Sequence, residues 1–198
     1  MNTILMKKYN LFILLLGFIG FTACGDDDAP DAENPEEIIT DVTLTFTPMG
    51  GGAAAVFTAN DPDGDGPQDI AVSGPVMLDA NMTYTLDIAL EGVGGENITE
   101  EVEEEGEEHQ FFFSFTDGLF SSPAGDGNID NRSDALDYQD QDDSGQPIGL
   151  MTDWTTSASP VTGSFRVLLK HQPDIKTATS GSTDGETDVD LTWSIEIQ

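Results

Sequence analysis

Residues 189–197 read VDLTWSIEI, and every second side chain in this stretch is apolar. Side chains on a β-strand point to opposite faces in turn, so the alternation predicts a strand with one buried and one solvated face. The same period of two recurs at 82–90 (MTYTLDIAL), 111–115 (FFFSF) and 165–169 (FRVLL). These four stretches indicate a domain built mainly from strands.

Shorter runs extend this pattern, and loops rich in Gly, Asp, Asn, Ser and Pro separate them. Only 97–108 looks helical, with Asn97 as a candidate N-cap and Glu100 three residues later. About nine strands with one short acidic helix or loop predict an all-β fold, an immunoglobulin-like or related antiparallel β-sandwich. The shorter runs lie at 38–46, 54–58, 70–72, 136–138 and 148–154.

The first residues have the features of an export signal. Lys7 and Lys8 precede the apolar stretch Leu11–Phe21, and the small residues Thr22-Ala23 lead to Cys24. This order resembles a bacterial lipobox, which implies cleavage before Cys24 and attachment of lipid to it. A plain signal peptide or a single membrane anchor is the alternative, although the apolar run is shorter than the roughly 20 residues of a membrane span.

The chain divides into three parts on this interpretation. Residues 1–23 are the leader, 24–37 are the lipidated cysteine with a disordered acidic tether, and 38–198 are the β-sandwich domain. The acidic triplet Asp26–Asp28 resembles the surface-export signal of Bacteroidetes-type lipoproteins. We therefore expect an exported protein anchored to the outer membrane and exposed at the cell surface, with the periplasmic face as the alternative.

The net charge limits the partners of the chain. It contains 6 Lys and Arg against 38 Asp and Glu, and two of the basic residues lie in the leader. An acidic protein repels the phosphates of nucleic acid, so nucleic acid is excluded as a partner. Such a surface attracts cations, and it also keeps an exported protein soluble.

Two aspartate-rich segments resemble calcium loops. Asp61, Asp63, Asp65 and Asp69 surround Gly66, and Asp140 and Asp142 precede Gly145 with similar spacing. The twelfth position of each loop is not acidic, being Val72 and Met151. A weak calcium site and a polar turn therefore both remain open, because Asp and Gly also favour turns.

The two histidines suggest another site. His109 is in phase with the apolar positions of 111–115, and His171 is in phase with those of 165–169. If these strands are antiparallel neighbours, the two imidazoles meet at one rim of the sandwich. With Glu105 and Glu108 they form a candidate zinc or copper site, and two unrelated strand-end histidines are the alternative.

Four segments resemble a group of small Bacteroidetes-type lipoproteins, and the likeness spans most of the chain after the leader. This resemblance implies a lipoprotein that assists nutrient uptake across the outer membrane. The segments are EEVEEEGEEHQFFF (100–113), QPIGL (146–150), LKHQP (169–173) and GETD (185–188).

Together these features predict a non-enzymatic binding or accessory module that captures a metal ion or metal-bearing nutrient for an uptake receptor. The alternative is a structural or adhesive surface module with loops stabilised by calcium. A hydrolase would need two carboxylates facing each other across an open cleft. No Gly-x-Ser-x-Gly motif is present, and lipidation would consume the thiol of Cys24.

Overall fold

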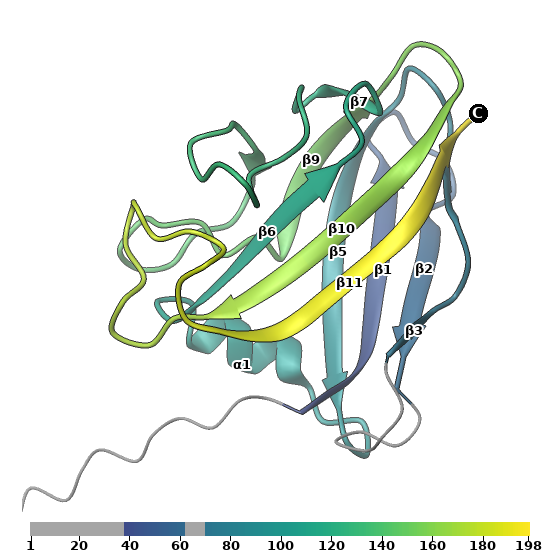
Figure 1. Cartoon of the computed structure of the whole chain (residues 1–198). Coiled ribbons are helices and arrows are strands. Elements are labelled where there is room, and N and C mark those ends of the chain that lie inside the picture. Colours follow the sequence, from purple (N-terminus) through teal and green to yellow (C-terminus); the bar gives the residue numbers. More distant parts are fainter. Residues whose placement is uncertain (1–37, 62–69) are drawn as a thin grey trace, which may run out of the picture. The chain divides into compact units, whose positions relative to one another are not determined.

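Two β-sheets face each other in an open, sandwich-like arrangement, and one short helix lies at the end where β6 begins (Figure 1). The computed structural model describes residues 38–61 and 70–198, so the predictions for Cys24, the leader, the tether, Asp63, Asp65 and Asp69 fall outside it. Within the described ranges, no helix is long and apolar enough to cross a membrane.

The larger sheet contains seven of the strands. Its order is β3 (Ala71–Val72), β2 (Ala55–Asn60), β1 (Ile39–Pro48), β5 (Thr83–Gly92), β9 (Met151–Thr156) and β7 (Phe120–Ser122), and β8 (Asp137–Tyr138) also pairs with β9. The smaller sheet has the order β4 (Val76–Leu78), β11 (Glu186–Ile197), β10 (Val161–His171) and β6 (His109–Phe115).

The core lies between the two sheets and is built from the alternating apolar positions. Trp154 of β9 and Phe165 of β10 are buried with their ring centroids 5.2 Å apart, and Phe113 of β6 lies 5.4 Å from Trp154. Edge-to-face aromatic pairs of this kind add about 0.5–1.5 kcal/mol each beyond the area that they bury. The long strands predicted from the period of two are therefore confirmed, and so is the mostly β fold.

Three details of the sequence prediction need correction. The described residues contain eleven strands rather than about nine, because the three-residue strands β4 and β7 are too short to show a period. Strand β4 pairs with β11 in parallel, so the smaller sheet is mixed. Helix α1 (Ile98–Glu104) is shorter than 97–108, and the Asn97 side chain makes no cap hydrogen bond to it.

A second apolar patch lies on the outer face of the smaller sheet. Phe112 of β6 and Leu168 of β10 point away from the main core, yet they are only 0% and 4% exposed. Two loops shield this face from water, 123–136 before β8 and 172–185 between β10 and β11. The Arg132 guanidinium lies 5.9 Å from the centre of the Phe112 ring, so the first loop packs directly on the sheet.

Hydrogen bonds order the second loop and hold the two loops to each other. Gln172 donates from its side-chain amide to the carbonyls of Gly181 and Asp184, at 3.0 Å each. The Ser182 hydroxyl donates to the Ile129 carbonyl at 2.5 Å, which links the two loops. The loops therefore form a defined layer over the outer face of β6 and β10.

The first loop also covers the free edge of β6. Gly127 has φ of +95°, and a Cβ there would overlap the Phe113 carbonyl oxygen, so only glycine fits. The next residue, Asn128, accepts a hydrogen bond from the Phe113 amide at 3.0 Å and donates to the Tyr138 hydroxyl at 2.9 Å. This close approach fixes the first loop against β6.

Candidate functional site

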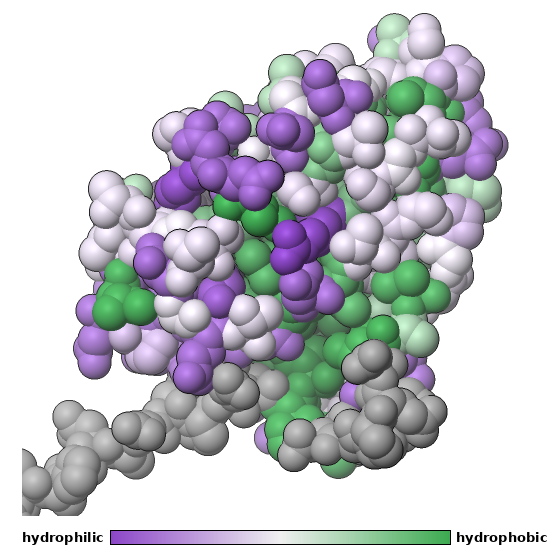
Figure 2. All heavy atoms as spheres, viewed as in Figure 1, coloured by the Kyte–Doolittle hydropathy of each residue, from purple (hydrophilic) through white to green (hydrophobic). Residues whose placement is uncertain are grey.

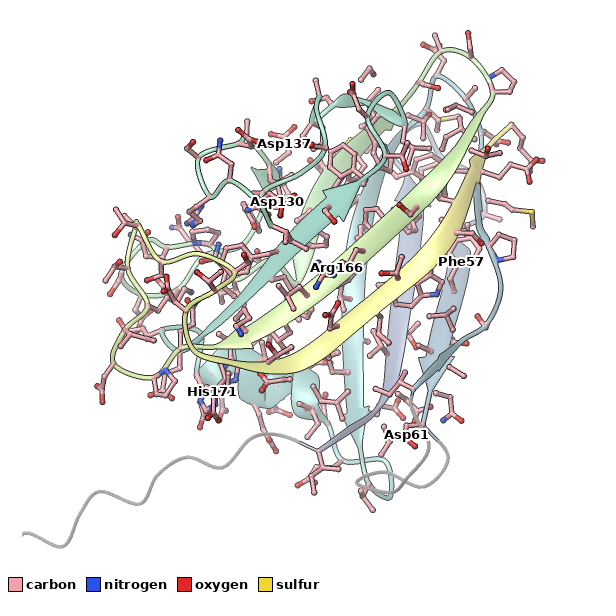
Figure 3. All side chains as sticks on the ribbon, in the orientation of Figure 1. Phe57, Asp61, Asp130, Asp137, Arg166 and His171 are labelled. Carbon is pink, nitrogen blue, oxygen red and sulfur yellow. The ribbon has the colours of Figure 1, made fainter. Side chains whose placement is uncertain are left out.

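The histidine side chains meet, because β6 and β10 are the antiparallel neighbours that this interpretation required. His109 and His171 are directly opposite each other in the β6–β10 pair. Their ring centroids lie 4.6 Å apart and the ring planes differ by 5°, so the imidazoles are stacked. Figure 3 shows His171 at the end of β10, beside the helix.

Carboxylates surround the two stacked rings. Nε2 of His171 lies 3.3 Å from Oε2 of Glu108, and Nε2 of His109 lies 3.8 Å from Oδ2 of Asp188. Nδ1 of His109 lies 3.2 Å from the main-chain oxygen of Glu105, so the contact uses the backbone of Glu105. The predicted Glu108 is thus beside an imidazole, whereas the sequence pattern did not indicate Asp188.

Asp188 reaches the histidines because β11 contains a bulge. Leu169 pairs with Val189 and Lys170 pairs with Thr187, so Asp188 is an extra residue between them. A bulge re-aims the side chain of the inserted residue, and the Asp188 side chain is fully buried here. Simple alternation from Val189 places Asp188 on the solvated face, so no sequence signal indicated this position.

This arrangement does not bring ligands together around one metal position. The lone pair of an imidazole nitrogen lies in the ring plane, and two parallel stacked rings do not converge on one point in the way a tetrahedral zinc site needs. Across residues 38–61 and 70–198, no group of three or more His, Cys, Asp or Glu side chains could hold a metal ion. Zinc or copper binding stays a prediction.

The second aspartate segment forms a turn held by its own carboxylates. Asp140 accepts hydrogen bonds from the amides of Gly149 at 2.8 Å and Met151 at 3.1 Å. Burial raises the pKa of Asp140, and these backbone hydrogen bonds partly offset that rise. Asp142 accepts from the Gln146 amide at 2.8 Å. The geometry therefore favours the turn interpretation for 140–146.

Asp61 is the only aspartate of the first segment that the structure describes. It is buried, and its amide donates to the Thr40 carbonyl at 2.7 Å, directly after β2. Figure 3 shows it away from His171, Asp130 and Asp137. Calcium binding by this segment stays a prediction.

A lysine of the chain itself, with a buried side chain, lies next to the acidic residues of 103–108 and the 141–146 turn. Lys176 extends from the 172–185 loop, and its Nζ lies 2.8 Å from Oδ2 of Asp142 and donates to the Gly106 carbonyl at 2.6 Å. The two side chains are 1% and 2% exposed. Hollows of about 300 and 230 Å³ flank this ion pair between the acidic residues of 103–108 and the 141–146 turn.

The ion pair shifts both pKa values. Burial lowers the pKa of Lys176, and the hydrogen bond and charge of Asp142 act against that shift. Burial alone would raise the pKa of Asp142, but the hydrogen bond from Lys176, the Gln146 amide and the Lys176 charge lower it on balance. The ammonium group of Lys176 therefore takes the place that a captured cation would need at this point.

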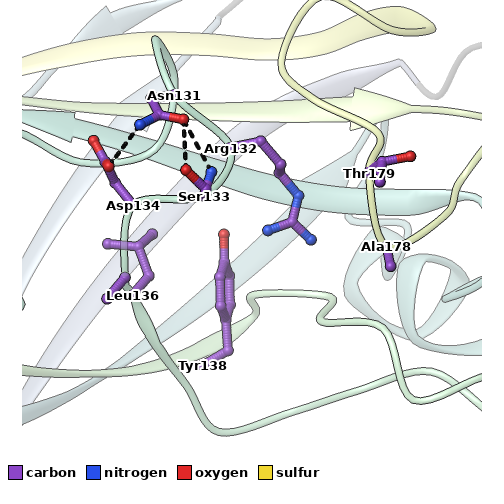
Figure 4. Close-up of a pocket in the computed structure, with 9 residues that line it drawn as sticks. Asn131, Arg132, Ser133, Asp134, Leu136, Tyr138, Ala178 and Thr179 are labelled. Carbon is purple, nitrogen blue, oxygen red and sulfur yellow. Dashed lines mark hydrogen bonds between the residues drawn. The ribbon is translucent and has the colours of Figure 1, made fainter.

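A larger hollow of about 520 Å³ opens between the two loops that cover the smaller sheet (Figure 4). Arg132 and Tyr138 line it from one side, and Ala178 and Thr179 line it from the other. We call this hollow the loop pocket. Its remaining lining residues are Asn131, Ser133, Asp134, Ala135 and Leu136.

The rim of the loop pocket is ordered by a local turn. Oδ1 of Asn131 accepts hydrogen bonds from the amide and the hydroxyl of Ser133, at 3.2 and 2.8 Å. Nδ2 of Asn131 donates to Oδ1 of Asp134 at 2.8 Å. These residues were not predicted as a site from the sequence, because Asn, Ser and Asp in a loop are the ordinary composition of a turn.

Two side chains fix the walls of the loop pocket, one to the opposite loop and one to strand β6. Nε of Arg132 donates to the Ser180 carbonyl at 2.8 Å, and the Tyr138 hydroxyl donates to the Phe111 carbonyl at 2.7 Å. Burial raises the pKa of Tyr138 to about 12, so this hydroxyl stays protonated at neutral pH. The pocket therefore combines fixed walls with one cationic group.

The charged groups on the outer face of the smaller sheet form a separate feature. Figure 2 shows strongly hydrophilic side chains at the centre of this view, where Figure 3 labels Arg166. Nε and one terminal nitrogen of Arg166 donate to the two carboxylate oxygens of Asp190, at 2.7 Å each.

Comparison of the whole chain with protein-family models, with curated proteins and with solved structures finds no match in any of the three.

Proposed function

We propose that this protein is a non-enzymatic binding module of the outer membrane or cell surface, anchored through lipid on Cys24. The loop pocket is its ligand site, and an outer-membrane uptake receptor is its proposed partner. The observation that carries the ligand site is a hollow of about 520 Å³ between two loops that hydrogen bonds hold to each other, the first of which is also bonded to strand β6. Small-molecule sites are commonly concave, largely preformed and of about this volume.

The loop pocket suits a ligand better than the histidine pair does. The imidazoles of His109 and His171 are buried against each other, and Lys176 already neutralises Asp142 in the acidic region. A soluble small molecule reaches the loop pocket without displacing either pair. The finer description of the fold as immunoglobulin-like is also a proposal, which an experimental structure would test.

The test is a thermal-shift screen of the purified chain against small organic molecules, with two tryptophan variants. Ala178→Trp fills the loop pocket, and Ala124→Trp places the same side chain on an exposed loop position that does not line it. We expect a compound that raises the melting temperature of wild type and Ala124→Trp to lose its effect on Ala178→Trp. A ligand that stabilises all three proteins equally would place the binding site elsewhere.

A further inference from the structure

We propose that the loop pocket binds the carboxylate group of a small organic acid, with Arg132 as the residue that recognises the anion. This inference rests on the proposed function and names the chemical class of its ligand. It starts from the small number of cationic side chains in the described part of a chain with formal net charge −32. They are Arg132, Arg166, Lys170 and Lys176.

Three of these four cationic groups are engaged within the protein. Arg166 donates two hydrogen bonds to Asp190, and Lys176 is paired with Asp142. Lys170 is buried and donates to the Thr187 hydroxyl at 2.7 Å. Such internal partners leave these three groups poorly placed to bind a ligand.

Arg132 differs from the other three in what holds it. Its Nε donates to the Ser180 carbonyl, and its guanidinium lies over the Phe112 ring at 5.9 Å. Among the ion pairs of the described residues, none joins Arg132 to a carboxylate. Figure 4 shows the guanidinium between the Tyr138 ring and Ala178, at the wall of the loop pocket.

The guanidinium is therefore positioned in advance of ligand binding. Its Nε and the Phe112 contact fix the plane of the group, while its two terminal nitrogens have no hydrogen-bond partner among residues 38–61 and 70–198. A planar arginine fork matches the geometry of a carboxylate and binds it through two parallel hydrogen bonds. Preorganisation of this kind lowers the entropic cost of binding.

The rest of the loop pocket suits the organic part of such an acid. Leu136, Ala178 and the ring of Tyr138 offer apolar surface beside the guanidinium. The Tyr138 hydroxyl is held by the Phe111 carbonyl and the Asn128 amide, so it adds no negative charge. The one carboxylate in the lining, Asp134, is bound by the Asn131 amide on the far side of that turn from Arg132 (Figure 4).

The test uses benzoate as the probe and benzamide as its neutral match, added to the ¹⁵N-labelled full chain in an NMR titration. We expect benzoate, up to about 10 mM, to shift the Arg132 Nε–Hε signal and the amides of 131–138 and 178–179. Benzamide should bind at least about tenfold more weakly, because it lacks the charge that strengthens the hydrogen bonds. Equal binding of benzoate and benzamide would overturn the inference, as would the absence of any shift with benzoate, acetate and hexanoate.

Two pairs of variants separate recognition of the charge from the shape of the pocket. Arg132→Gln should weaken benzoate binding at least about tenfold, and Arg166→Gln should leave it unchanged. Ala178→Asp should weaken binding relative to Ala178→Asn, and neither change touches the Arg132–Ser180 hydrogen bond.

The outcomes distinguish this inference from the proposed function. If Arg132→Gln binds benzoate as tightly as wild type, the carboxylate inference fails. In that case the loop pocket would still be a ligand site if a neutral compound binds wild type and Ala178→Trp abolishes that binding. If no compound in the thermal-shift screen depends on the pocket, the proposed function fails as well.

Discussion

His109 and His171 stack face to face, with their ring centroids 4.6 Å apart, at the end of the β6–β10 pair. This relationship joins the two strands at the end of the sandwich next to α1. Glu108 lies beside the His171 ring and Asp188 lies beside the His109 ring, so each imidazole has its own carboxylate neighbour. The two rings pack against each other between carboxylates, and we expect the removal of either ring to lower the stability of the fold.

The first prediction concerns the cavity that removal of one ring leaves. His109→Ala should lower the free energy of unfolding by about 2–4 kcal/mol, because removal of the buried ring leaves a cavity and loses its packing contacts. Urea denaturation measures this difference. Thr162→Ala, at an exposed position of β10, should change stability by less than about 0.5 kcal/mol. A His109→Ala protein as stable as Thr162→Ala would contradict the packing role.

The second prediction separates a buried ion pair from an exposed one. Lys176→Met should cost about 3–5 kcal/mol, because it leaves the carboxylate of Asp142 buried without its cation. Arg166→Met breaks the exposed pair with Asp190, whose side chains are 36% and 44% exposed, and should cost at most about 1 kcal/mol.

A double variant checks the cause of the Lys176 effect. Lys176→Met combined with Asp142→Asn removes both charges and keeps an oxygen that can accept from the Gln146 amide. It should be more stable than Lys176→Met alone in the same urea experiment. Additive losses would mean that the two side chains do not interact.

The third prediction is the pH dependence of that ion pair. The pKa of Asp142 lies below its ordinary value of 3.8 in the folded protein, so its contribution is fully present above that value. It should be lost as the pH falls through the folded-state pKa, because protonation removes the charge that pairs with Lys176. The stability advantage of wild type over Asp142→Asn should therefore shrink as the pH falls below 3.8.

Asp140 provides the opposite sign within the same turn. Burial raises its pKa above 3.8, so the folded state binds the proton more tightly than the unfolded chain. The free energy of unfolding of wild type should therefore fall relative to that of Asp140→Asn as the pH rises above about 3.8 through the folded-state pKa. A pH profile of the same sign for both variants would contradict these assignments.

The fourth prediction tests the close approach that fixes the first loop. Gly127→Ala should lower stability by more than about 4 kcal/mol or prevent folding, because the new Cβ would overlap the Phe113 carbonyl oxygen. Gly125 also has positive φ, at +100°, but a Cβ at that position would meet no neighbouring atom within 4 Å. Gly125→Ala should therefore cost only about 1–2 kcal/mol, the conformational term alone. Equal losses in thermal denaturation would remove the steric argument.

The fifth prediction concerns the membrane anchor. The full chain expressed in a Gram-negative host should incorporate radiolabelled palmitate, and Cys24→Ala should abolish the label because the chain has no other cysteine. Lipid on a cysteine holds a protein at the membrane through the apolar area of its acyl chains. Labelling that survives in Cys24→Ala would refute the anchor.

Much of the fold could be predicted from the period of two. The alternation in 189–197 and 165–169 places Trp193 and Phe165 in the core, and both are fully buried. The phase of His109 and His171 indicated that both rings lie on the apolar side of their strands, and they meet because β6 and β10 are antiparallel neighbours, which the sequence left open. The burial pattern depends on side-chain alternation alone, which a sequence carries directly.

Other features depend on contacts that alternation does not encode. Asp188 faces His109 only because β11 has a bulge, and β4 is too short to show any period. The loop pocket arises where two loops fold over Phe112, and Arg132 becomes distinctive only when the partners of the other cationic groups are known. Long-range packing of this kind is visible only in three dimensions.

The central claim is that a ligand occupies the loop pocket, and intermolecular NOEs test it most directly. With benzoate bound to the ¹³C,¹⁵N-labelled chain, the account predicts NOEs from the benzoate ring protons to the methyl groups of Leu136 and Ala178 and to the Tyr138 ring. NOEs confined to other surfaces, such as α1 or the outer face of β1 and β5, would contradict it, as would their absence.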